Sequence, residues 1–166
     1  MAAFKGDKLM PLPELTTHGL LPVGTHDASI DEIAEVFARF QKSDKRMKLM
    51  DRLKEFLKAA WAVDDGIQVY IDGSFLMQTV DEPSDIDIVL VLPATWDFGA
   101  ELPPFKYNVL SKRMVRRLYR FDILVGIEGH ASSAEALDFF RQVHVKWAEP
   151  LAIPVGTSKG IIRVLR

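Results

Sequence analysis

The stretch from residue 70 to residue 92 constrains the fold most, because it joins two strand-like apolar runs through a short polar segment. The first run, residues 67–71, has the length and composition of a buried strand, and Gly73-Ser74 interrupts it. The second run, residues 85–92, alternates aspartate with isoleucine and then becomes wholly apolar. We therefore expect two strands, with a short helix opening at Gly73-Ser74 and a turn at residues 82–84 between them.

The second of these strands carries two candidate metal ligands, Asp85 and Asp87. Side chains at positions i and i+2 of a strand point to the same face, so the two carboxylates should lie side by side. Neighbouring carboxylates repel each other, and a divalent cation with oxygen ligands relieves that repulsion. A third acid, Asp122, lies in a similar alternating run, residues 118–125. For an isolated Asp-x-Asp pair, the alternative is a strand end with two solvated carboxylates.

Gly73 and Ser74 have the properties of a phosphate-binding turn. Glycine lets a phosphate approach the backbone closely, and serine offers a hydroxyl and a helix N-terminus to an anion. A phosphate cradle about one loop away from a candidate metal pair is the combination that nucleotide chemistry requires.

With these residues the sequence resembles the polymerase-β-like nucleotidyltransferase superfamily, and most closely its minimal nucleotidyltransferases. The resemblance extends over residues 67–125 and depends on Gly73-Ser74, on Ser84-Asp85-Ile86-Asp87 and on Asp122. It implies an α/β (α+β) fold in which helices flank a small mixed sheet. It also implies that Asp85, Asp87 and Asp122 are catalytic and bind two Mg²⁺ ions, or Mn²⁺ in their place. Gly73, Ser74 and Ser84 are the implied nucleotide contacts.

The implied reaction moves a nucleoside monophosphate from a nucleoside triphosphate, with ATP favoured, to a hydroxyl of a protein or an RNA. Minimal members are often toxin or antitoxin components, so the resemblance implies a toxin–antitoxin or phage-defence role, with a toxin as a candidate partner. One segment departs from the family pattern, because residues 75–80 are apolar and lack the glycine and basic residues that many minimal members carry there. This departure favours the alternative of a catalytically silent module that docks to a partner protein or binds RNA.

Five cations lie just before Asp122, and the first four of them fall in a helix that we expect over residues 108–118. They are Lys112, Arg113, Arg116, Arg117 and Arg120. Lys112 and Arg116 are spaced i, i+4 and share one helix face, so we expect both to contact a nucleotide triphosphate or a nucleic-acid backbone. A solvated helix face is the alternative.

The remaining segments predict one domain, residues 29–166, preceded by a proline-rich arm, residues 1–28, whose leucines favour packing across the domain. Ser29 and Glu32 have capping-box spacing and should begin a helix. A second helix should extend to about Val63, with a basic outer face that we expect to be solvated, and a polyanion-binding face is the alternative. That face contains Lys45, Arg46, Lys48, Arg52, Lys54 and Lys58. A further helix near residues 132–143 and a strand at residues 161–165 complete the chain.

Residues 93–107 should form a long loop that is rich in aromatic residues. They contain Trp96, Phe98, Phe105 and Tyr107. We expect these rings to pack against the core, and stacking on a nucleobase is the alternative.

Composition adds limits rather than a function. The chain has 166 residues, 48% of them hydrophobic and 27% charged, with a net charge of −2, so its overall charge does not favour nucleic-acid binding. It has no cysteine, which excludes disulfides and thiolate zinc sites. No apolar run approaches the roughly 20 residues that span a membrane, and we expect a cytoplasmic protein. The sequence does not predict an oligomeric state.

Overall fold

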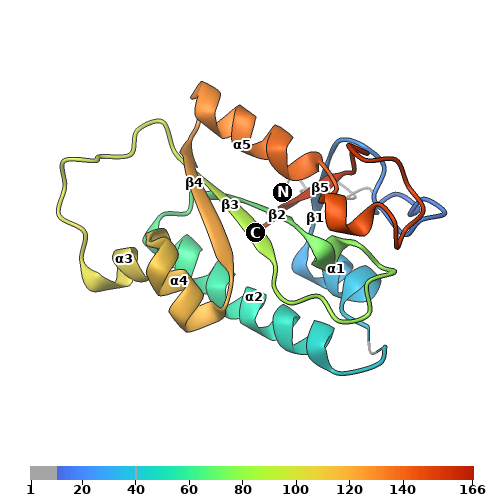
Figure 1. Cartoon of the computed structure of the whole chain (residues 1–166). Coiled ribbons are helices and arrows are strands. Elements are labelled where there is room, and N and C mark those ends of the chain that lie inside the picture. The colour runs from blue at the N-terminus through green and yellow to red at the C-terminus, as the bar shows by residue number, and fades with distance from the viewer. Residues whose placement is uncertain (1–10, 40) are drawn as a thin grey trace, which may run out of the picture.

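A five-stranded mixed sheet in the order β1-β5-β2-β3-β4 forms the centre of the computed structural model, which describes residues 11–39 and 41–166 (Figure 1). The strands are β1 (Thr25–Ala28), β2 (Gln68–Asp72), β3 (Asp87–Leu92), β4 (Asp122–Ile127) and β5 (Ile161–Val164). The pairs β1–β5 and β3–β4 are parallel, whereas β2 is antiparallel to both β5 and β3. The mixed α/β architecture expected from the sequence is therefore present.

Helices cover the sheet on both sides. The α-helices are α1 (Ile30–Phe37), α2 (Lys45–Val63), α3 (Pro104–Leu110), α4 (Lys112–Tyr119) and α5 (Ala131–Arg141), and two short 3₁₀ turns are η1 (Ser74–Leu76) and η2 (Val145–Trp147). In Figure 1, α2 lies below the strands and α5 lies above them. No helix in the described ranges is long and apolar enough to cross a membrane.

Local sequence signals account for the first two helices. Ser29 Oγ accepts a hydrogen bond from Glu32 N, and Glu32 Oε2 accepts one from Ser29 N, which completes the predicted capping box. In α2, residues at helical spacing, among them Leu53, Phe56 and Ala60, are fully buried in the main core. The apolar stripe of α2 therefore packs in the same core as the buried residues of the strands, and α2 forms the helical layer on that side of the sheet.

The expectation of one helix over residues 108–118 is wrong. The chain forms α3 and α4 instead, with a break at Ser111, whose ψ of 120° is extended. Pro104 suits the first turn of α3, and Ser111 Oγ accepts a hydrogen bond from Met114 N as the cap of α4. The aromatic-rich loop after β3 therefore covers only residues 93–103.

The N-terminal arm contributes to the sheet, which the sequence analysis did not anticipate. Its last four described residues form β1, which pairs with β5 across more than 130 positions of sequence. Leu20 and Leu21 are buried, so the arm packs across the domain as its leucines predict. The first ten residues of the arm lie outside the described part of the chain.

Candidate metal and nucleotide site

Three aspartates stand in register across neighbouring strands at one end of the sheet. Asp87 is the Cα partner of Asp72 on β2 and of Asp122 on β4. Asp72 ends β2, whereas Asp87 and Asp122 begin β3 and β4. The antiparallel and parallel pairings thus gather acidic side chains at a single edge of the sheet.

The carboxylates of Asp85, Asp87 and Asp122 form one cluster, as the sequence predicts. Each offers an oxygen atom that lies within 4.8 Å of those of the other two. We had expected Asp85 to lie inside the strand, but β3 begins at Asp87, so Asp85 precedes it. The turn before β3 nevertheless brings its carboxylate to the group, and Ser84 Oγ donates a hydrogen bond of 3.3 Å to Asp85 Oδ1.

The cluster is electrostatically strained without a cation. Burial, followed by the charges of Asp85 and Asp122, raises the pKa of Asp87 to about 6, and the charge of Lys146 acts in the opposite direction. Asp122 Oδ1 is buried and accepts no hydrogen bond from the described residues, although Arg116 Nη1 lies 3.3 Å away. A divalent cation with oxygen ligands would relieve the repulsion between the carboxylates and would coordinate the buried oxygen that accepts no hydrogen bond.

Gly73 lies in close contact with the carboxylate of Asp87. Its φ is +86°, and a Cβ atom placed on it would lie 2.6 Å from Asp87 Oδ2. Any larger residue would therefore displace the carboxylate as well as strain the backbone. Ser74 follows at the start of η1.

A cavity of about 580 Å³ opens beside the acids. Gly73, Ser74 and Ser84, the three residues of the predicted nucleotide-binding turns, line it together with Asp85 and Asp87. Among the described residues, the lining does not include Lys112 or Arg116. Arg116 instead pairs with Asp122, and Lys112 lies one turn earlier on α4.

A buried ion pair that the sequence analysis missed joins the cavity to the sheet. Lys159 Nζ contacts Asp72 Oδ1, and both side chains are almost fully buried. Burial lowers the pKa of Lys159 to about 7. Asp72 therefore pairs with Lys159, and the three-carboxylate cluster beside it consists of Asp85, Asp87 and Asp122.

A hydrogen-bonded ribbon carries Lys159 to this position. Val143 N donates to Thr157 O at 2.9 Å, and Lys159 N donates to Arg141 O at 2.7 Å. The same ribbon brings Lys146 and His144 to the cavity. Side chains from the segments 139–147 and 155–159 thus form the wall that faces the acids.

Arg46 holds the unusual segment that follows Ser74. The guanidinium donates hydrogen bonds of 2.6–2.9 Å to the carbonyl oxygens of Phe37, Phe75, Met77 and Val80. Its side chain is buried, so the expectation that Arg46 lies on a solvated face is wrong. The reason is that residues 75–80 fold over the start of α2 and turn their carbonyl groups toward it.

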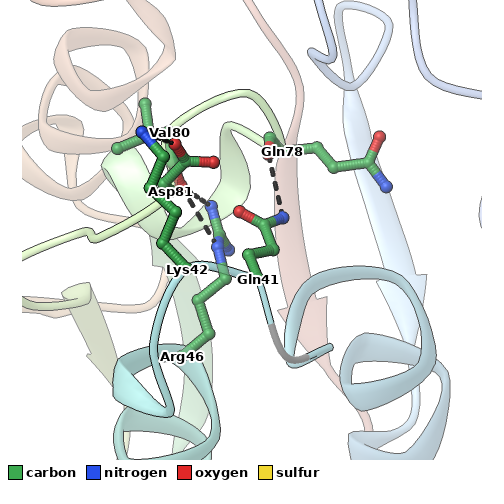
Figure 2. A network of polar contacts seen from close by, with 6 residues as sticks. All are labelled: Gln41, Lys42, Arg46, Gln78, Val80 and Asp81. Atoms are coloured by element: carbon green, nitrogen blue, oxygen red, sulfur yellow. Dashed lines mark hydrogen bonds and ion pairs between the residues drawn. The ribbon is translucent and has the colours of Figure 1, made fainter.

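Figure 2 shows how neighbouring residues complete this attachment. Gln41 Nε2 donates to Gln78 O at 3.2 Å, and Lys42 Nζ pairs with Asp81 Oδ2 at 2.8 Å. The segment therefore keeps a fixed backbone without the glycine and basic residues that the minimal nucleotidyltransferases usually have there.

The four aromatic residues of the expected 93–107 loop lie away from the described cavity lining. Trp96 packs against the main core, as expected. Phe98, Phe105 and Tyr107 are exposed instead, which corrects the expectation that they plug the core. Phe105 and Tyr107 belong to α3, because Pro104 starts that helix early.

One comparison with known proteins gives a match. The family model described as "Family of unknown function (DUF6932)" matches residues 13–165. Searches of the curated proteins and of the solved structures give no match. Because the family model spans nearly the whole chain, the protein belongs to the family of unknown function DUF6932.

Proposed function

We propose that this protein is a Mg²⁺-dependent nucleotidyltransferase with a polymerase-β-like fold. The observation that carries the proposal is the convergence of three carboxylates within 4.8 Å, two of which, those of Asp85 and Asp87, line one cavity together with Gly73. Neither the acids nor the glycine turn would be decisive alone, but nucleotidyl transfer requires both in one place.

In this proposal Asp85, Asp87 and Asp122 would hold two Mg²⁺ ions. When bound, the ions neutralise phosphate charge and align the attacking and leaving oxygens. Gly73, Ser74 and Ser84 hold the β- and γ-phosphates of a nucleoside triphosphate. Lys146, whose charge already acts on Asp87, lies on the facing wall, where it would balance the remaining negative charge of the phosphates.

The chemical step is a displacement at the α-phosphorus. The oxygen of the acceptor hydroxyl forms a bond to the α-phosphorus, and the bond from that phosphorus to the bridging oxygen breaks, so that pyrophosphate leaves. Asp122 is the group proposed to take the hydroxyl proton, because one of its oxygens is buried without a hydrogen bond among the described residues. Lys112 and Arg116 lie outside the cavity lining and are proposed to contact a phosphate chain that approaches Asp122 from α4.

The acceptor in this proposal is a hydroxyl of a protein or an RNA, and the biological setting is a toxin–antitoxin or phage-defence system. The experiment is label transfer from α-labelled ATP, CTP, GTP or UTP in host extract with Mg²⁺. The wild type is compared with Asp87→Asn and with Glu101→Gln, a matched change at an exposed acid.

Label on a macromolecule with the wild type and Glu101→Gln, but not with Asp87→Asn, is the expected result. Equal labelling by Asp87→Asn would refute the role of the acids. Absence of label with every nucleotide would favour the alternative, a module that docks to a partner or binds RNA without chemistry.

A further inference from the structure

The cavity wall that faces the acids is unusually apolar for an exposed surface. Phe139, Val145 and Val155 line the cavity and are 71%, 60% and 72% exposed. They come from α5, η2 and the loop before β5, so three separate segments place large apolar side chains around one opening. Single exposed apolar residues are ordinary, but a group of them at a cavity marks a binding surface.

This wall is held in place from behind. Phe139 contacts Phe140, a second lining residue, edge to face at 5.7 Å between ring centroids. Val143 of the same segment is buried in a small second core with Leu20 and Met77. Because the supporting residues are packed, the exposed rings are presented by a fixed scaffold.

The side of the cavity opposite this apolar wall is charged. Asp85 and Asp87 lie on the sheet side, and Lys146 and the buried Lys159 also contribute to the lining. A ligand that satisfies both sides needs a strongly anionic, metal-binding end and a flat apolar end. Aromatic rings in proteins pack well against such flat groups.

We propose that the wall formed by Phe139, Phe140, Val145 and Val155 binds the nucleobase of the substrate, with Phe139 and Phe140 as its aromatic contacts. This inference depends on the proposed function, because the triphosphate must occupy the acid side. The nucleobase therefore contacts α5 and the ribbon that follows it, and it does not contact the aromatic residues after β3. Since stacking area grows with ring size, purine nucleotides bind more tightly than pyrimidine nucleotides at this wall.

The test separates base binding from phosphate binding. Calorimetry with Mg²⁺ measures the affinity of each protein for inorganic triphosphate and for the α,β-methylene analogue of ATP, which the proposed reaction cannot cleave. The variants are Phe139→Ser and Phe140→Ser, and the matched control is Phe98→Ser, which changes an aromatic residue of similar exposure (66%) outside the cavity lining. Thermal melts confirm that each variant is folded.

The wild type and Phe98→Ser should bind the nucleotide analogue more tightly than inorganic triphosphate. Phe139→Ser and Phe140→Ser should weaken the analogue by about tenfold and leave inorganic triphosphate unchanged. If both variants keep the full preference for the analogue, or if the wild type has no preference, the base assignment is wrong while triphosphate binding still supports the proposed function. If the wild type binds neither ligand, both the inference and the proposed function fall.

Discussion

Replacing Asp87 with asparagine should stabilise the metal-free protein at neutral pH. In the fold, burial and the charges of Asp85 and Asp122 raise the pKa of this carboxyl from 3.8 to about 6. The folded state therefore binds more protons than the unfolded state between about pH 4 and pH 6. Stability is lost as the pH rises through this window, and the full penalty is present above about pH 6.

The shift sets the size of the effect. A displacement of roughly two pKa units corresponds to about 3 kcal/mol of unfolding free energy, since each unit is worth about 1.4 kcal/mol. This is an upper value, because neighbouring charges adjust when one is removed. For a chain of this length, about 3 kcal/mol corresponds to an increase of roughly 6–12 °C in melting temperature.

The assay is thermal unfolding in EDTA from pH 5 to pH 8, repeated with excess Mg²⁺ or Mn²⁺. Asp87→Asn should melt above the wild type at pH 7.5 in EDTA, and the gap should close toward pH 5. Divalent cations should raise the melting temperature of the wild type and leave that of Asp87→Asn unchanged. Glu101→Gln is the matched control, and it should behave as the wild type does. An Asp87→Asn variant that is equally or less stable than the wild type at pH 7.5 in EDTA would refute the repulsion argument.

Two further predictions concern residues that support the site. Lys159→Met leaves Asp72 buried without its partner and should lower the free energy of unfolding, measured in urea, by about 3–5 kcal/mol. Adding Asp72→Asn should recover much of that loss. In contrast, Arg163→Ala breaks an exposed pair with Asp27 and should lower the free energy of unfolding by at most about 1 kcal/mol. A cost for Lys159→Met as small as that for Arg163→Ala would contradict the pairing. Arg46→Met should lower the free energy of unfolding by about 3 kcal/mol or more, because buried carbonyl oxygens lose their hydrogen-bond donor. Amide hydrogen exchange of residues 75–80 should also accelerate. Unchanged exchange there would show that Arg46 does not hold the segment.

Local patterns were sufficient to predict much of the acid side of the site. The apolar run before Gly73, the alternation at Asp87 and the similar run at Asp122 are each properties of a few consecutive residues. The same is true of α2, whose C-terminal end at Val63 agrees with its apolar spacing. Such patterns can be recognised in the sequence without knowing which strands pair with one another.

The opposite wall could not be predicted because it depends on contacts between distant residues. Lys159 lies in a loop with no regular pattern, and only the pairing of residues 141–159 brings it to Asp72. Arg46 has the helical spacing of a solvated residue, yet residues 75–80 fold over it. The one available signal for Asp72 was its position directly before Gly73-Ser74.

The most direct test of the central claim is Mn²⁺ binding measured by electron paramagnetic resonance, with the α,β-methylene analogue of ATP present. If Asp85, Asp87 and Asp122 form a metal site, the wild type and Glu101→Gln should bind Mn²⁺, and Asp87→Asn and Asp122→Asn should lose most of that binding. Undiminished Mn²⁺ binding by both aspartate variants, or none by the wild type, would contradict the claim that these three carboxylates hold the metal for nucleotidyl transfer.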